Sequence, residues 1–306
     1  MRLVTFEAGT AQRLGAVVGE RVIDLQAAAA ALNARGRGTA EAGSPADMLG
    51  LLRAGDDGLA TVRSLLDAVG DAAGADASGY SYDLAIVRLR APVPAPNKIL
   101  CIGQNYRDHV LEQNAKMPEK PIIFAKFTNT VIGPGDDIVH PTTTRELDYE
   151  AELVVVIGKT GKHIAREQAY EYVAGYMAGH DVTARDLQRG DGQWVRAKSQ
   201  DTFAPLGPYL VTRDQIPDPQ ALDIKMWANG EVRQDSNTAN LIFDVPHLIA
   251  FISEGMTLEP GDLIFTGTPP GVGAWRKPEP VFLQPGDETT VEVAGLGRLI
   301  NRIVAD

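Results

Sequence analysis

The chain has 306 residues, of which 44% are hydrophobic and 23% charged, as expected for a soluble globular protein with one large domain or two. Its net charge of −11 is not offset by any basic block, which argues against a nucleic-acid or anionic-membrane partner. The single cysteine, Cys101, excludes an intrachain disulfide and a multi-cysteine zinc site. With no secretory apolar segment and no run near the roughly 18 residues of a membrane helix, the sequence predicts a cytoplasmic protein.

Residues 1–70 are predicted to form a small α/β subdomain that holds no catalytic constellation. Its expected strands and helices lie at 2–6, 13–25, 25–32, 45–52 and 59–69. Residues 70–81 are rich in Ala, Gly, Ser and Asp, which is typical of a flexible linker. A strand is expected over 84–89, and the three prolines at 92, 94 and 96 cannot lie inside a sheet. We therefore expect a subdomain over 1–70, a linker and leading strand over 71–95, and a catalytic domain over 96–306.

From residue 98 onward, strands and turns dominate and helices are few. Asn105 is expected to cap a helix over 106–113. The other expected helices and strands lie at 98–102, 122–126, 146–157, 165–172, 223–228, 231–234, 246–252, 262–266, 288–293 and 299–304. The order shows no regular alternation of strand and helix, so it predicts an α+β fold rather than a doubly wound sheet.

The segment 146–157 alternates acidic and apolar side chains and then becomes wholly apolar. A period of two places Glu146, Asp148, Glu150 and Glu152 on one face of a strand. At about 3.3 Å per residue, the Cα atoms of Glu150 and Glu152 are roughly 7 Å apart, so their side chains can converge on one hard cation. Mg²⁺, Mn²⁺ and Ca²⁺ all fit such donors. The alternative is a solvated acidic face on an edge strand.

Asp181 is the strongest candidate for a third oxygen ligand. It ends the apolar run 173–180, where an unpaired carboxylate would be costly. The alternative is that Asp181 caps a helix over 183–187, and the two roles are compatible.

His109 and Glu112 are three residues apart on the helix expected over 106–113, so they share a face. Imidazole carries protons near neutral pH, and a neighbouring carboxylate fixes its tautomer and raises its basicity. The pair is therefore a candidate catalytic dyad. The alternative is an ordinary helical surface pair.

Four further side chains are candidate substrate contacts. Lys198 lies between an apolar stretch and a Pro/Gly-rich loop, where it either neutralises a substrate anion or extends to solvent. Arg185 and Gln188 share a helical face near Asp181, or else form a solvated face. Thr268 lies in the loop 266–273, which can offer backbone N–H groups and a hydroxyl to a carboxylate, or can be a structural turn.

Together these motifs are more informative than any one of them. From about residue 95 to the C-terminus, their order and spacing resemble the fumarylacetoacetate hydrolase (FAH) family. Within that family, the resemblance is strongest to the FAH-domain-containing proteins. The segments that carry the resemblance lie at 103–109, 112–114, 121–124, 150–152, 179–186, 197–199 and 266–269.

The resemblance implies a mixed β-sandwich roll, usually dimeric, with a small N-terminal subdomain. It implies Mg²⁺ or Mn²⁺, with Ca²⁺ as an in vitro substitute, held by Glu150, Glu152 and Asp181. His109 and Glu112 match a catalytic pair on a segment that closes over the ligand. We also expect Lys198 to be catalytic. The positions that match substrate contacts of the family are Arg185, Gln188 and Thr268.

The implied substrates are small 2-oxo acids and β-diketo acids. Our first expectation is a metal-dependent enzyme that hydrolyses a C–C bond of an acylpyruvate-type substrate. The alternatives are decarboxylation of oxaloacetate or its keto–enol tautomerisation, because the same enolate chemistry leads to all three reactions. A non-catalytic alternative is a structural cation-binding protein.

Overall fold

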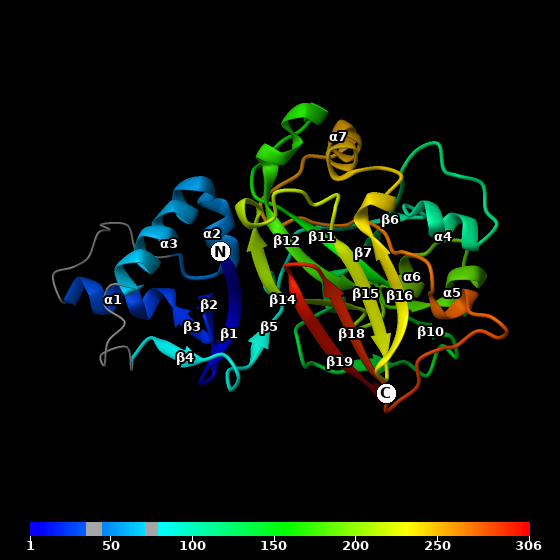
Figure 1. Cartoon of the computed structure of the whole chain (residues 1–306), viewed down its shortest axis with the longest axis horizontal. Helices are drawn as coiled ribbons and strands as arrows, with labels where there is room; N and C mark the ends of the chain where they lie inside the picture. Colours follow the sequence, from blue (N-terminus) through cyan, green and yellow to red (C-terminus); the bar gives the residue numbers. More distant parts are fainter. Residues whose placement is uncertain (35–44, 71–78) are drawn as a thin grey trace.

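The computed structural model describes residues 1–34, 45–70 and 79–306. Within these ranges, a twelve-stranded sheet, a five-stranded sheet and a two-stranded pair form most of the molecule (Figure 1). Helices are few and short, so the α+β fold class is confirmed. None of the helices in these ranges is both long enough and apolar enough to cross a bilayer.

The large sheet contains the strands of both the N-terminal and the central segments. Its order is β4-β3-β2-β1-β14-β12-β11-β17-β6-β7, with β5 beside β1 and β8 beside β14. Neighbours are antiparallel except for the pairs β17/β6 and β14/β8. The strands are β1 Arg2–Ala8, β2 Ala11–Val18, β3 Arg21–Asp24, β4 Ser81–Asp83, β5 Leu89–Arg90, β6 Ile99–Gly103, β7 Ile122–Lys126, β8 Val131–Ile132, β11 Ala151–Ile157, β12 Val173–His180, β14 Ala204–Thr212 and β17 Leu263–Phe265.

The smaller sheet packs against the large one and is built mostly from the C-terminal part of the chain. Its order is β16-β15-β18-β19-β9, and β10 pairs with β13 in a separate two-stranded sheet. These strands are β9 Ile138–His140, β10 Leu147–Asp148, β13 Thr183–Ala184, β15 Asp223–Ala228, β16 Glu231–Asn237, β18 Glu288–Val293 and β19 Gly297–Ala305.

The helices lie around the sheets. The α-helices are α1 Leu25–Ala34, α2 Met48–Arg53, α3 Gly55–Gly70, α4 Arg107–Glu112, α5 Arg185–Gly190, α6 Val195–Lys198 and α7 Val245–Gly255. Short 3-10 helices lie at η1 Thr128–Thr130, η2 Arg166–Tyr172, η3 Arg213–Gln215, η4 Thr238–Asn240 and η5 Gly273–Trp275. The helix expected over 165–172 is therefore a 3-10 helix.

Strand β11 is apolar on both faces because it separates two hydrophobic clusters. Leu153 and Val155 belong to a cluster shared with the five-stranded sheet and α7. Val154 and Val156 belong to a second cluster, shared with the N-terminal strands and helices. The sandwich therefore buries β11, which carries Glu152 and follows directly after Glu150, from both sides, as its continuous apolar run requires.

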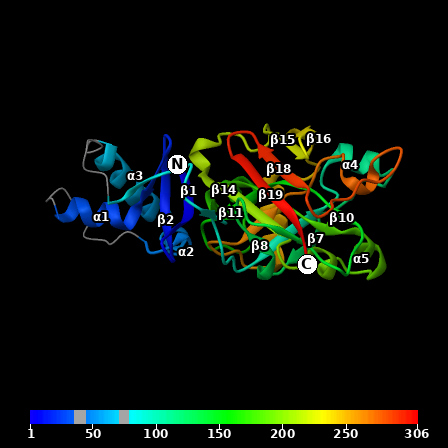
Figure 2. The ribbon, with the colours of Figure 1, turned by 90° about the horizontal axis from the view of Figure 1, so that it is seen from below.

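The N-terminal elements gather at one end of the elongated molecule (Figures 1 and 2). They share the large sheet with the rest of the chain, because β1 pairs with β14 at Arg2↔Val211 and Leu3↔Leu210. The division into 1–70, 71–95 and 96–306 stays a prediction. Residues 71–78 of the expected linker lie outside the described ranges.

The strand expected over 84–89 is wrong. Residues 84–88 form a turn between β4 and β5. Asp83 organises this turn, since its side chain accepts the Ala85 N–H at 3.0 Å and its carbonyl accepts the Ile86 N–H at 3.2 Å. A short polar side chain that bonds to the backbone two residues ahead favours a turn over extended chain.

Candidate metal centre and active site

The acidic segment consists of two strands, not the single strand expected over 146–157. β10 ends at Asp148 and β11 begins at Ala151. The Ala151 N–H donates to the Gln234 side chain at 2.8 Å, which satisfies the backbone where the strand is interrupted. In β11 and β12, Glu152 pairs with Gly179, and the Asp181 N–H donates to the Glu150 carbonyl at 2.9 Å. This register brings Asp181 beside the two glutamates.

The carboxylates of Glu150, Glu152 and Asp181 converge. One oxygen from each lies within 4.8 Å of the other two. Their residues are only 5%, 1% and 0% exposed, so a solvated acidic face is the wrong interpretation. Asp181 also caps no helix, because α5 begins at Arg185 with Ala184 in the capping position. Three carboxylate oxygens at this spacing suit a hard divalent cation such as Mg²⁺ or Mn²⁺.

Lys198 neutralises part of this cluster from α6. Its Nζ lies 2.8 Å from Glu150 Oε2 and 2.7 Å from Asp181 Oδ2. The side chain is 2% exposed, so the interpretation that it extends to solvent is wrong. A buried ammonium requires such partners, because removal from water would otherwise cost several kcal/mol.

A second buried lysine, Lys126, was not singled out in the sequence. Its Nζ lies 2.7 Å from Asp181 Oδ1 and donates to the carbonyls of Val182, Lys198 and Phe203. Burial lowers its pKa, although Asp181 opposes this. The one sequence signal for it is a lysine that ends the otherwise apolar strand β7.

The two glutamates differ in their electrostatic environment. Burial would raise the pKa of Glu150, but ion pairs with Lys198 and Arg185 hold it below its ordinary value. Burial raises the pKa of Glu152 well above its ordinary value, and the nearby charges of Asp181 and Glu150 add to the effect. A divalent cation between these carboxylates would offset their mutual repulsion, so the donor set fits the metal that the sequence predicts.

Arg185 is part of the same charge network. Its guanidinium donates to Asp148 Oδ2 at 2.7 Å, to Glu150, and to Gln188 Oε1 at 2.9 Å. Arg185 is 8% exposed, so it does not lie on a solvated helix face. Asp148 is itself held by the backbone N–H groups of Gly273 and Ala274. Arg185 therefore presents its remaining donor capacity to the pocket from a fixed position.

His109 and Glu112 lie on α4 and contact each other. His109 Nδ1 is 3.2 Å from Glu112 Oε2, and Gln113 Nε2 is 2.6 Å from His109 Nε2. This network assigns the neutral tautomer with the proton on Nδ1, because Glu112 accepts and Gln113 donates. His109 is 5% exposed, so an ordinary surface pair is the wrong interpretation. Gln113 is a pocket residue that sequence reasoning missed, although it lies four residues after His109 and so shares its helical face.

The loop 266–273 contacts carboxylates of the chain itself. The Gly267 N–H donates to Glu152 Oε2 at 2.6 Å, and the Gly271 N–H donates to Glu112 Oε1 at 3.0 Å. The Thr268 hydroxyl accepts from Gln234 Nε2 at 2.8 Å. The loop thus joins the acidic cluster to α4.

Asn105 does not cap the helix, contrary to the sequence expectation. Tyr106 occupies the capping position of α4. The Asn105 side chain donates to the carbonyls of Phe243 and Thr266 and accepts the Phe243 N–H at 2.8 Å. Its amide therefore ties the segment before α4 to the loop at 266–273.

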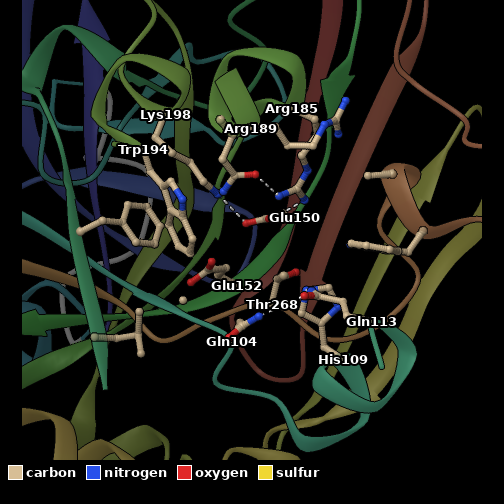
Figure 3. Close-up of a pocket in the computed structure, with 16 residues that line it drawn as sticks. Gln104, His109, Gln113, Glu150, Glu152, Arg185, Arg189, Trp194, Lys198 and Thr268 are labelled. Carbon is tan, nitrogen blue, oxygen red and sulfur yellow. Dashed lines mark hydrogen bonds and ion pairs between the residues drawn. The ribbon is translucent and has the colours of Figure 1, made fainter. Parts of the chain in front are cut away.

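One pocket of about 290 Å³ is lined by His109, Glu150, Glu152, Arg185 and Lys198, whereas Asp181 and Glu112 contact lining residues from behind. Figure 3 shows Lys198, Trp194, Arg185 and Arg189 on one side, with His109, Gln113 and Gln104 on the other and Glu150 and Glu152 between them. Gln188 and Thr268 also line the pocket, together with an apolar set that sequence reasoning did not identify: Ile102, Phe124, Trp194, Ala274 and Trp275. The cavity is large enough for a small organic acid.

Comparison with known proteins agrees with the family resemblance. The family model described as Fumarylacetoacetate (FAA) hydrolase C-terminal matches residues 98–304. A relative from Rattus norvegicus, named oxaloacetate tautomerase Fahd2a, mitochondrial, is 51% identical over 219 residues, which cover 71% of this chain and 70% of that protein. A Xenopus laevis relative, named oxaloacetate tautomerase fahd2, mitochondrial, is 43% identical over 310 residues, covering 99% of this chain and 90% of that protein.

A solved structure shares the fold over the whole length. The maleylpyruvate hydrolase from Sphingobium sp. SYK-6, in complex with manganese(II) ion and pyruvate, is 33% identical with a TM-score of 0.77. The match covers 100% of this chain and 99% of that one.

The relatives contradict the expected cytoplasmic location, since those from rat and frog are named mitochondrial. The expectation depended on the lone Cys101 and on the missing secretory segment. A low cysteine count indicates a reducing environment and does not distinguish one reducing compartment from another.

Proposed function

The chain belongs to the fumarylacetoacetate hydrolase family, and on that basis we propose that it is a divalent-metal-dependent oxaloacetate tautomerase. The observation that carries the proposal is a buried carboxylate triad, two members of which line one small pocket together with the histidine of a His–Glu pair. The names of the rat and frog relatives select keto–enol interconversion among the three reactions that such a site supports.

Glu150, Glu152 and Asp181 would hold the cation, Mg²⁺ or Mn²⁺ in the cell and Ca²⁺ as an in vitro substitute. When bound, it would supply Lewis-acid stabilisation of the negative charge that develops on the 2-oxo group. Three buried carboxylates provide the oxygen donors that these cations prefer.

Lys198 and Arg185 would receive the substrate's 2-oxo acid end. Both are buried cations with fixed partners, so little side-chain entropy is lost when a carboxylate binds. Glu150 and Asp181 take two of the three N–H donors of Lys198. The third would bond to the oxo oxygen, where positive charge stabilises an enolate. Gln188 and Thr268 would add hydrogen bonds from the pocket wall.

His109 would move the proton. In the assigned tautomer Nδ1 donates to Glu112, so Nε2 is the basic nitrogen. The hydrogen bond from Gln113 to His109 Nε2 must break before this nitrogen can accept a proton. Nε2 then takes a proton from the carbon beside the oxo group to give the enolate, and it returns that proton to the oxo oxygen to give the enol, so that His109 ends the cycle neutral. The reverse steps return the keto form.

The test is the rate at which the ultraviolet absorbance of enol-oxaloacetate relaxes to its equilibrium value. The purified protein with added Mg²⁺ should accelerate relaxation over the buffer rate, and EDTA should abolish the acceleration. Equal rates with protein, with protein plus EDTA and with buffer would refute the proposal.

Hydrolysis of an acylpyruvate is the second candidate, because the Sphingobium neighbour is a maleylpyruvate hydrolase of the same fold. Here His109 would activate water for attack on the distal carbonyl. Pyruvate release from acetylpyruvate, measured beside oxaloacetate decarboxylation and tautomerisation, separates the three reactions. The non-catalytic alternative is not supported, since the relatives are named as enzymes.

The expected homodimer and the domain division remain part of this proposal. The family resemblance supports a dimer, and light scattering on the purified protein would measure the mass of the assembly. We further propose that residues 96–306 form the catalytic domain, because the family model matches 98–304.

A further inference from the structure

Arg189 lines the mouth of the pocket and has no role in the mechanism above. It lies four residues after Arg185 on α5, so the two side chains share a helical face about 5–6 Å apart at Cβ. Arg185 is buried, whereas the Arg189 side chain is 60% exposed. Figure 3 shows both on the same side of the pocket as Lys198. The pocket therefore has cations at two depths.

The charges at the inner end are nearly balanced. The buried carboxylates are Asp148, Glu150, Glu152 and Asp181, and the buried cations are Lys126, Arg185 and Lys198. Counted in the ionised state in which carboxylates bind a cation, four negative charges against three positive ones leave one negative charge in excess. A divalent cation would convert this to one excess positive charge, which a single substrate carboxylate neutralises.

A second carboxylate on the substrate would find no surplus positive charge at that depth. Burying it without a partner would be costly. Arg189 is the remaining cation among the described pocket residues, and it lies one helical turn toward solvent. A guanidinium is suited to carboxylate binding because its planar donors bond to both oxygens.

The present partner of Arg189 is Glu146, which contacts the Arg189 guanidinium through Oε2 and does not line the pocket. Exposed ion pairs of this kind contribute little free energy, so the guanidinium is easily redirected to another carboxylate. Glu146 therefore competes with any carboxylate that reaches the pocket mouth.

We propose that Arg189 binds the distal carboxylate of a dicarboxylic 2-oxo acid and makes the pocket selective for dicarboxylates over monocarboxylates. The inference builds on the proposed function in one respect: the 2-oxo acid end binds at the triad. Arg189 is a specificity-determining residue and takes no part in proton transfer.

The test compares the binding of oxaloacetate and pyruvate to the full chain with Mg²⁺. Trp194 and Trp275 line the pocket, so their fluorescence reports how much of the pocket is occupied at equilibrium, whether or not the bound acid is interconverted. Wild-type protein should bind oxaloacetate more tightly than pyruvate. Arg189→Gln should raise the oxaloacetate Kd about tenfold, the loss expected for one charge-assisted hydrogen-bonded pair, and change the pyruvate Kd less than twofold.

Glu146→Gln should act in the opposite direction. Removal of the competing carboxylate frees Arg189, so the oxaloacetate Kd should fall about twofold to fivefold. Arg196→Gln is the matched control. Arg196 is an exposed arginine, 56% accessible, that pairs with Asp191 and does not line the pocket. The Arg196→Gln substitution should change neither the oxaloacetate Kd nor the pyruvate Kd. Thermal melts should confirm that all three variants fold.

Several results would overturn the inference. These are equal wild-type affinities for the two acids, equal losses for both acids in Arg189→Gln, or an Arg196→Gln effect as large as that of Arg189→Gln. A failure of the proposed function is distinguishable. In that case oxaloacetate would bind through Arg189 as described, and its keto–enol relaxation would not accelerate.

Discussion

The two walls of the pocket are held in different ways. On the strand side, Glu150, Glu152 and Asp181 are fixed by buried lysines and by the register of β11 and β12. On the helix side, His109 bonds within the six residues of α4 and to the adjacent Gln113. The helix is joined to the rest of the chain through contacts such as Gly271 to Glu112 and Ser236 to Asp108. Metal binding and proton transfer should therefore respond to different substitutions.

The broadest effect is expected from Glu152→Gln on the strand side, because it should lower both metal affinity and turnover. Glutamine keeps the size of the side chain and can still accept the Gly267 N–H, but it removes one anionic donor. Mn²⁺ affinity, measured by calorimetry, should fall at least about 100-fold, and turnover should fall with it. An unchanged Mn²⁺ affinity would remove Glu152 from the proposed ligand set.

His109→Ala on the helix side should separate the two functions. The value of kcat should fall about 10²- to 10⁴-fold, because a positioned general base is lost. Mn²⁺ affinity should stay within twofold of wild type, since His109 is not one of the three carboxylate donors. A parallel loss of metal binding in this variant would show that the two walls are not independent.

The strand side should also be the more sensitive to acid. Burial, with Lys126 adding to it, lowers the pKa of His180 to about 3, and neither ring nitrogen has a partner among the described residues. The folded state binds fewer protons than the unfolded chain between this pKa and the ordinary value of 6.5. The contribution of His180 to the free energy of unfolding is therefore fully present above pH 6.5 and is lost as the pH falls toward 3.

Denaturant unfolding of the metal-free protein measures this contribution. Between pH 7 and pH 4, the free energy of unfolding should fall by about 3 kcal/mol more in the wild type than in the His180→Leu variant. Because other carboxyl groups titrate equally in both proteins, the difference isolates His180. Parallel losses in the two proteins would mean that His180 is not held neutral by its surroundings.

Gly103→Ala should give the smallest effect and should leave the metal site intact. A Cβ on Gly103 would lie 2.6 Å from Trp194 Cζ3, so the indole must shift. Trp194 lines the pocket, and we expect KM to rise roughly twofold to tenfold. Mn²⁺ affinity provides the control and should be unchanged.

Local sequence patterns carried much of the prediction. The period of two predicted that Glu150 and Glu152 lie together where the chain enters the core, although Glu150 lies in the break before β11. The mixed order of strands and turns indicated the α+β class. The same patterns failed where a side chain had an alternative partner. Asn105 was expected to cap α4, yet it binds Phe243 and Thr266, which lie more than 130 residues away.

The sequence by itself determined which chemical groups are present and on which local face they lie, because backbone period and residue type are short-range properties. Only the tertiary structure decided how those groups are neutralised. Lys126 and Lys198 reach Asp181 from separate segments, and Gln234 of the five-stranded sheet reaches Thr268 in the loop 266–273. Buried charges and polar groups take whichever partner the packed core brings within 3 Å, and that choice depends on strand register and sheet packing rather than on neighbouring residues.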